Sequence, residues 1–219
     1  MIRRLTLGVL LGTAVLIAAE PAGRLELVYL AKPATTLLIG LIAWVARPAD
    51  PRYRRRVLAG LTLSLVGDVF LMVPGNWFVP GLASFLAAHL AYIAAFTAGR
   101  AALGEWRPLV PLALFGIGYL AVLWPGLGGL RVPVTGYLAA IVTMGWQANA
   151  RALDFAGRGA RWAAIGSVCF VASDALLAWN RFRAPFSWAG PAITVTYVMA
   201  QWLIARSVEA DAPVSTASS

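Results

Sequence analysis

The chain has 219 residues, of which 60% are hydrophobic and only 12% are charged. A soluble domain carries about twice that share of charged residues, because its surface needs polar cover. The composition therefore excludes a water-soluble globular protein and a disordered chain, and it favours a membrane protein. The formal net charge is +9, which in so apolar a chain indicates basic loops and no nucleic-acid partner.

The inventory of reactive side chains is small. One cysteine, Cys169, excludes an internal disulfide, and a single histidine, His89, excludes a Cys/His metal cluster. The chain has no Gly-x-Ser-x-Gly nucleophile motif and no glycine-rich phosphate loop. We therefore expect no metal and no cofactor.

Eight apolar stretches approach the length of about 20 residues that a helix needs to cross a bilayer core of about 30 Å. Short breaks rich in Pro, Gly and Arg separate them. The predicted fold class is all-α: a polytopic membrane protein with a bundle of eight transmembrane helices. One domain would cover residues 1–207, and residues 208–219 would form a disordered cytoplasmic tail. The stretches are Leu5–Ala19, Leu25–Ala46, Val57–Val73, Val79–Gly99, Pro108–Trp124, Val132–Ala150, Trp162–Asn180 and Trp188–Ile204.

The first stretch admits two interpretations. Leu5–Ala19 follows two arginines and ends in small residues, which is also the pattern of a cleaved signal peptide. The short spacing to the second stretch and the distribution of loop charges favour a retained helix.

The arginines divide unequally between the two ends of the predicted bundle. Loops on the side of the N-terminus carry thirteen arginines and loops on the other side carry four. By the positive-inside rule, both termini face the cytoplasm. The Arg-rich, Lys-poor composition is typical of a GC-rich bacterial genome, so we expect a multi-pass protein of the bacterial inner (cell) membrane. The thirteen are Arg3, Arg4, Arg47, Arg52, Arg54, Arg55, Arg56, Arg100, Arg107, Arg151, Arg158, Arg161 and Arg206; the four are Arg24, Arg131, Arg181 and Arg183.

Four ionisable residues lie inside the predicted spans, where each is a candidate for function because its burial in lipid is costly. They are Lys32, Asp68, His89 and Asp174, in chain order. A rise of about 1.5 Å per residue puts both aspartates about 16–18 Å from the cytoplasmic edge and His89 about 15 Å from the outer edge. Tyr197 falls at a similar level. These groups are expected in one layer near the middle of the membrane.

The two aspartate segments resemble each other. Ser64–Met72 aligns with Phe170–Ala178: a small residue precedes each aspartate and a leucine follows three places later. The two spans lie four apart and run in the same direction, as a parallel 4+4 repeat would give. Such a repeat would place both aspartates against one cavity.

Two carboxyl groups in a low-dielectric cavity cannot easily both ionise, so the pair shares a proton and offers an acid and a base together. Glycosidases use such a pair to pass through an oxocarbenium-like transition state. The same aspartates would also serve as a proton or ion relay in a transporter. A receptor or a structural, lipid-binding membrane protein is a further alternative, in which the aspartates, Lys32 and His89 only hold helices together.

Several segments together resemble the YhhN family of integral-membrane lysoplasmalogenases (alkenylglycerophospholipid hydrolases). These are Lys32-Pro33, Ser64–Met72, Phe78–Phe96, Ser173–Ala178 with the residues around it, and Thr196–Ile204. One position departs from the family pattern, because Val198 stands where a second tyrosine is expected.

The resemblance implies hydrolysis of the vinyl ether bond of a lysoplasmalogen, a lysophospholipid with an alkenyl chain, to a fatty aldehyde and a glycerophospho-alcohol. Asp68 and Asp174 would be the catalytic acid and base, with their order open. Arg181 and Arg183 are further candidates for contact with the substrate phosphate. The alternative for Tyr92, Asn180 and Gln201 is hydrogen bonding between helices. The oligomeric state is open. Candidate substrate-binding residues are Lys32, Ser64, His89, Tyr92, Ser173, Asn180, Tyr197 and Gln201.

Overall fold

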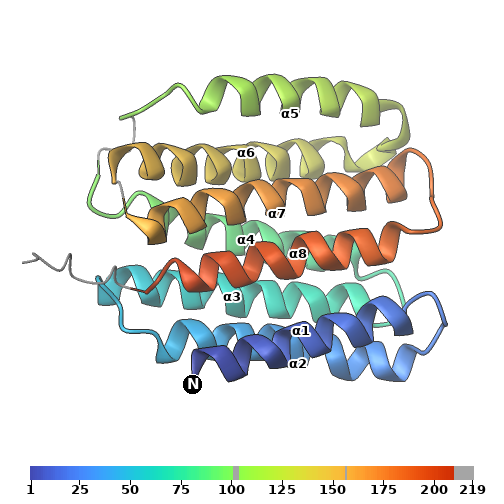
Figure 1. Cartoon of the computed structure of the whole chain (residues 1–219). Helices are drawn as coiled ribbons and strands as arrows, with labels where there is room; N and C mark the ends of the chain where they lie inside the picture. The colour runs from blue at the N-terminus through green and yellow to red at the C-terminus, as the bar shows by residue number, and fades with distance from the viewer. Residues whose placement is uncertain (101–103, 156, 210–219) are drawn as a thin grey trace, which may run out of the picture.

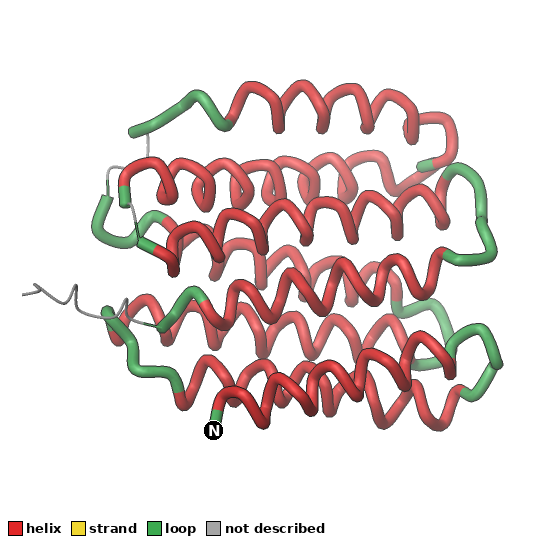
Figure 2. Tube along the Cα trace, viewed as in Figure 1, coloured by secondary structure: helices red, strands yellow, loops and turns green. Residues whose placement is uncertain are grey.

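The computed structural model describes residues 1–100, 104–155 and 157–209. Over these residues the chain forms eight α-helices and two short 3-10 turns, and no strand (Figure 2). The predicted all-α class is confirmed. The helices are α1 (Ile2–Ala19), α2 (Leu25–Val45), α3 (Pro51–Met72), α4 (Phe78–Phe96), α5 (Leu109–Leu123), α6 (Arg131–Asp154), α7 (Arg158–Phe182) and α8 (Ala189–Arg206).

The helices lie side by side with their axes nearly parallel, and each runs in the direction opposite to the helix before it (Figure 1). The start of α1 and the end of α8 lie at one end of the bundle, here named the terminal end. The turns after α1, α3, α5 and α7 lie at the opposite end, here named the far end. The chain therefore alternates between the two ends in the order that the arginine count requires.

Several helices extend beyond the predicted apolar stretches at the terminal end. The third helix begins at Pro51 instead of Val57, because the Asp50 side chain accepts a hydrogen bond from the Arg52 amide at 2.7 Å and Pro51 stands at the first helical position. The seventh begins at Arg158 instead of Trp162. The arginines at the start of α3 and α7 thus stand on helical turns that precede the apolar segment: Arg52, Arg54, Arg55, Arg56, Arg158 and Arg161.

Five helical segments are long and apolar enough to cross a membrane by length and composition: α1, α2, α4, α7, and α5 together with its 3-10 extension. The other three, α3, α6 and α8, fall short of this measure. Two of them, α3 and α8, carry the polar side chains Asp68 and Gln201, which are buried between helices. The parallel 4+4 repeat stays a prediction.

The last helix lies inside the bundle, where α8 packs against α7, α1, α2 and α3, whereas α5 lies at one edge and packs mainly on α6. The first helix joins this core, since Leu16 is fully buried and the Trp202 indole donates a hydrogen bond to Thr6 at 3.2 Å. Val208, in the predicted tail, is buried as well. Residues 210–219 of that tail lie outside the described part of the chain.

Candidate active site

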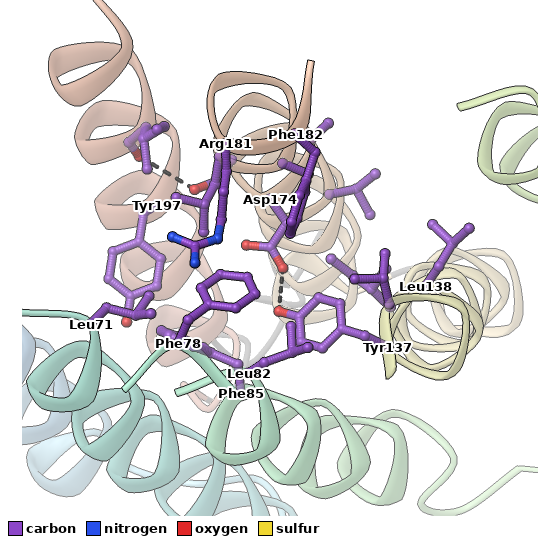
Figure 3. Close-up of a pocket in the computed structure, with 18 of the residues that line it drawn as sticks. Leu71, Phe78, Leu82, Phe85, Tyr137, Leu138, Asp174, Arg181, Phe182 and Tyr197 are labelled. Atoms are coloured by element: carbon purple, nitrogen blue, oxygen red, sulfur yellow. Dashed lines mark hydrogen bonds between the residues drawn. The ribbon is translucent and has the colours of Figure 1, made fainter. Parts of the chain in front are cut away.

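A cavity runs from the middle of the bundle to its far end, and both membrane aspartates line it (Figure 3). The cavity and the open space at its mouth together contain about 1,250 Å³ that is not filled by protein atoms. Leucine, valine, isoleucine and phenylalanine form most of its wall. The predicted convergence of Asp68 and Asp174 on one cavity is what the structure shows. The polar or charged lining residues are Lys32, Thr36, Asp68, Tyr119, Tyr137, Ser173, Asp174, Arg181, Thr194 and Tyr197.

Asp68 of α3 is buried and surrounded by hydrogen-bond donors. The Lys32 ammonium of α2 lies 3.3 Å from its Oδ1, and the Tyr197 hydroxyl of α8 donates to its Oδ2 at 2.7 Å. The Thr36 hydroxyl lies 3.4 Å from Oδ2. A cation and two hydroxyl donors favour the ionised carboxylate.

A chain of hydrogen bonds behind Tyr197 fixes the direction of its hydroxyl proton. The Gln201 amide nitrogen donates to the Tyr197 oxygen at 3.0 Å, and the Tyr92 hydroxyl donates to the Gln201 carbonyl oxygen at 2.7 Å. Because the phenol oxygen of Tyr197 already accepts a hydrogen bond, its own proton points to Asp68. These hydrogen bonds therefore direct the Tyr197 hydroxyl proton to Asp68, and Tyr92 and Gln201 lie outside the cavity wall.

Asp174 of α7 has a different environment. The Tyr137 hydroxyl of α6 donates to its Oδ2 (Figure 3). Among the described residues, its only ion-pair partner is the imidazole of His89, with Nε2 at 3.9 Å. The His89 Nδ1 lies 2.5 Å from the Phe85 carbonyl oxygen, so Nδ1 carries the proton and Nε2 presents a lone pair. A lone pair facing a carboxyl group favours a proton on that carboxyl.

Aromatic rings separate the surroundings of the two aspartates and hold their partners in place. Phe170 of α7 lies edge-on to Tyr197 at 5.7 Å between ring centroids and to His89 at 4.8 Å. Phe85 packs edge-on against both Phe170 and Tyr197. Such T-shaped contacts are the preferred geometry for neighbouring rings. They fix the rings that carry the hydrogen-bonding groups.

The far end of the cavity carries a cation. The Arg181 guanidinium lies 3.7 Å from the centroid of the Phe78 ring and 5.7 Å from that of Phe182. Figure 3 shows its side chain beside Phe78, in the same group of lining residues as Asp174. The cavity thus has an acidic inner part and a basic outer part.

The predicted substrate-binding residues divide into two groups. Lys32, Ser173 and Tyr197 line the cavity. The remaining five stand outside the lining, either buried behind it or, for Asn180, at the far end, where its side chain accepts a hydrogen bond from the Phe186 amide at 3.2 Å. Those five are Ser64, His89, Tyr92, Asn180 and Gln201.

Two polar neighbours of the aspartates were not predicted. Thr36 follows Lys32 by four residues, which places it on the same helix face, so helical spacing gave a usable signal. Tyr137 stands in the sixth span without a charged residue nearby, and only the fold brings it to Asp174. The position that departs from the family pattern, Val198, is part of the cavity wall.

The sequence pattern of the YhhN family matches residues 27–208 of this chain, which contain both aspartates and all of their polar neighbours. The chain belongs to the YhhN family.

Among the relatives of this YhhN-family protein, human lysoplasmalogenase TMEM86A is 40% identical over 166 residues, which cover 73% of this chain and 68% of the relative. A lysoplasmalogenase of Mycobacterium tuberculosis is 34% identical over 180 residues, covering 78% and 67%. The membrane protein YhhN of Escherichia coli, described as uncharacterized, is 30% identical over 179 residues, covering 81% and 85%. No solved structure matches the fold.

Proposed function

We propose that this YhhN-family protein is a membrane-embedded lysoplasmalogenase. It hydrolyses the vinyl ether bond of a lysoplasmalogen to a fatty aldehyde and a glycerophospho-alcohol. The observation that carries the proposal is that Asp68 and Asp174, with opposite hydrogen-bonding environments, line one apolar cavity. The names of the human and mycobacterial relatives support the same activity.

A vinyl ether suits this arrangement because its hydrolysis begins with a proton. Protonation of the β-carbon leaves an oxocarbenium ion at the carbon bonded to oxygen, and water captures that ion. The reaction needs one acid, one base and a site that accepts an alkyl chain. The apolar wall supplies the last, and two carboxyl groups of different protonation supply the first two.

The surroundings of the two aspartates favour one order of roles. Asp68 accepts from Lys32 and Tyr197, so it is the ionised carboxylate and acts as the base. Asp174 has a single hydroxyl donor and faces the lone pair of His89, so it holds the proton and acts as the acid.

The cycle then balances with these two groups. Asp174 gives its proton to the β-carbon, and the carboxylate of Asp68 takes a proton from the water that bonds to the oxocarbenium carbon. The hemiacetal that forms next loses its hydroxyl proton to Asp174 while Asp68 protonates the departing glycerol oxygen. The aldehyde and the alcohol leave, and both aspartates return to their starting states.

The remaining groups position these two. Lys32 and Tyr197 hold Asp68 ionised and directed into the cavity, and Gln201 and Tyr92 hold Tyr197. His89 faces the Asp174 carboxyl with Nε2 at 3.9 Å, and its ring is fixed by the bond from Nδ1 to the Phe85 carbonyl.

We further propose that all eight helices cross the bilayer with both termini in the cytoplasm of a bacterium. The thirteen-to-four distribution of arginines between the two ends supports this orientation. The far end of the cavity then faces the outer side of the inner membrane.

The test is aldehyde release from a 1-alkenyl lysophospholipid by the purified protein. We expect Asp68→Asn and Asp174→Asn to lose at least about 100-fold in kcat, the usual contribution of a positioned acid or base. Asp154→Asn is the matched control, since Asp154 pairs with Arg100 at the terminal end, away from the cavity. Near-wild-type turnover by folded Asp68→Asn or folded Asp174→Asn would refute the assignment of these two residues as the catalytic acid and base.

A transporter that uses the same aspartates predicts a different outcome. It would accumulate a solute or protons in sealed vesicles without forming aldehyde, and a lipid-binding protein would retain the lysolipid unchanged. Product formation by the purified wild-type protein separates the hydrolase from both.

A further inference from the structure

We propose that Arg181 binds the phosphate of the lysophospholipid and thereby selects phosphate-bearing alkenyl lipids over neutral ones. This inference rests on the proposed function for the identity of the reaction, but it concerns binding and has a test of its own. From the sequence alone, Arg181 and Arg183 were equal candidates; the structure distinguishes them.

Arg181 is the far-end arginine that lines the cavity, whereas Arg24, Arg131 and Arg183 do not belong to its wall. Its guanidinium is held over the Phe78 ring at 3.7 Å. The ion pairs among the described residues do not include it. A positioned guanidinium without a carboxylate partner, at the mouth of a cavity, is a suitable binder for a phosphodiester.

The charged groups nearest this mouth have other partners. Glu20, at the end of α1, accepts hydrogen bonds from the Thr194 hydroxyl at 3.2 and 3.3 Å. Lys32, the other cation in the cavity wall, is paired with Asp68 at 3.3 Å. Arg181 is therefore the cation of the wall for which the structure gives no carboxylate partner among the described residues.

The spacing along α7 fits the substrate. Arg181 follows Asp174 by two helical turns, so the two side chains stand on the same face about 10.5 Å apart along the axis. In a lysoplasmalogen, seven bonds join the vinyl β-carbon to the phosphorus. At about 3.3–3.6 Å for every three bonds, as in an extended backbone, they span about 8 Å. A β-carbon beside Asp174 thus brings the phosphate within reach of the flexible Arg181 side chain.

The kinetic test compares two substrates that differ only in the head group: a 1-alkenyl lysophosphoethanolamine and the neutral 1-alkenylglycerol. We expect Arg181→Gln to raise KM for the phospholipid about tenfold or more and to leave KM for the neutral lipid unchanged. Arg181→Lys should recover part of the loss. The matched control is Arg183→Gln, because Arg183 is an exposed arginine that does not belong to the cavity wall. An unchanged KM, or an equal rise for both substrates, would overturn the proposal.

The binding test separates this inference from the proposed function. It measures the affinity of the purified protein for a 1-O-alkyl lysophospholipid, which lacks the double bond and is not cleaved by this chemistry. Weaker binding by Arg181→Gln supports the phosphate site even if no aldehyde is ever formed from the alkenyl substrate. Equal binding by wild type and variant overturns the site even if the enzyme is active.

Competition identifies the source of the phosphate. We expect glycerophosphoethanolamine to displace the alkyl lysophospholipid from the wild type at lower concentration than inorganic phosphate does. Equal displacement by inorganic phosphate would assign Arg181 to a free anion and would overturn the selection of lipid head groups.

Discussion

The Lys32 ammonium lies 3.3 Å from Asp68 Oδ1 inside the helix bundle, with 21% of the lysine side chain and 2% of the aspartate side chain exposed. A charge buried at this depth is tolerated when a partner of opposite sign accompanies it. The pair joins α2 to α3, and it supports the proposed ionised state of Asp68 inside the bundle. In the proposed mechanism, the lysine acts through Asp68.

The first prediction concerns this pair. Lys32→Met leaves Asp68 without its cation, so we expect a loss of about 3–5 kcal/mol in the free energy of unfolding and loss of aldehyde release. Adding Asp68→Asn removes the unpaired charge, and stability should return at least halfway while activity stays absent. Thermal unfolding in detergent measures both effects. A double variant as unstable as the sum of the two single variants would contradict the pairing.

The second prediction concerns the hydrogen bonds behind Asp68. Tyr197→Phe removes a donor to a charged acceptor, so kcat should fall about 10- to 100-fold. Gln201→Leu removes the group that orients Tyr197, so it should lower kcat in the same direction but less, with KM unchanged. Tyr29→Phe, at a tyrosine that does not line the cavity, is the control. A rise in KM without a fall in kcat would mean that these residues bind substrate instead.

The third prediction concerns the proton. Infrared spectra of the purified protein near neutral pH should contain a C=O stretching band of a protonated carboxyl that shifts in heavy water. We expect the band to disappear in Asp174→Asn and to persist in Asp68→Asn, because only Asp174 holds the proton. The reverse pattern would exchange the roles of acid and base.

The fourth prediction concerns the packing that supports Tyr92. A Cβ atom added to Gly60 would lie 2.3 Å from Cε1 of the Tyr92 ring. Gly60→Ala should therefore destabilise the protein by about 1–3 kcal/mol and lower activity. Gly118→Ala adds the same methyl group to an exposed helical position with no atom within 4 Å, so it should be neutral or slightly stabilising. Equal thermal stability of the two variants would contradict the close contact.

The fifth prediction concerns orientation. After Cys169→Ala removes the native thiol, Arg183→Cys at the far end should react with an impermeant maleimide in intact cells. Arg55→Cys at the terminal end should react only after the membrane is opened. The opposite labelling pattern would place the termini outside the cell.

The length of the apolar stretches and the charge of the loops predicted much of the architecture, because the bilayer constrains both quantities. The eight helices lie where the eight apolar stretches do. Helical rise predicted His89 and Asp174 at a similar level, and their side chains lie 3.9 Å apart. The predicted ends of the helices were less accurate. Asp50, for example, caps α3 several residues before its apolar stretch begins.

The sequence could not separate residues that face the cavity from those one shell behind it. Tyr92 donates a hydrogen bond to Gln201, and Gln201 donates one to Tyr197, yet neither Tyr92 nor Gln201 lines the cavity. Tyr137 was missed for a related reason, because a tyrosine in a span gives no signal until a neighbouring helix is placed beside it. Rotation of each helix about its axis decides such contacts, and it depends on packing between distant segments.

The most direct test of the central claim is isotopic labelling of the products formed from a 1-alkenyl lysophospholipid. In heavy water, we predict one solvent deuterium on the aldehyde carbon next to the carbonyl, delivered by Asp174. In water enriched in ¹⁸O, the glycerophospho-alcohol should contain no ¹⁸O, because the bond between the vinyl carbon and oxygen is the one that breaks. Entry of ¹⁸O into the glycerol product, or the absence of aldehyde, would contradict the account.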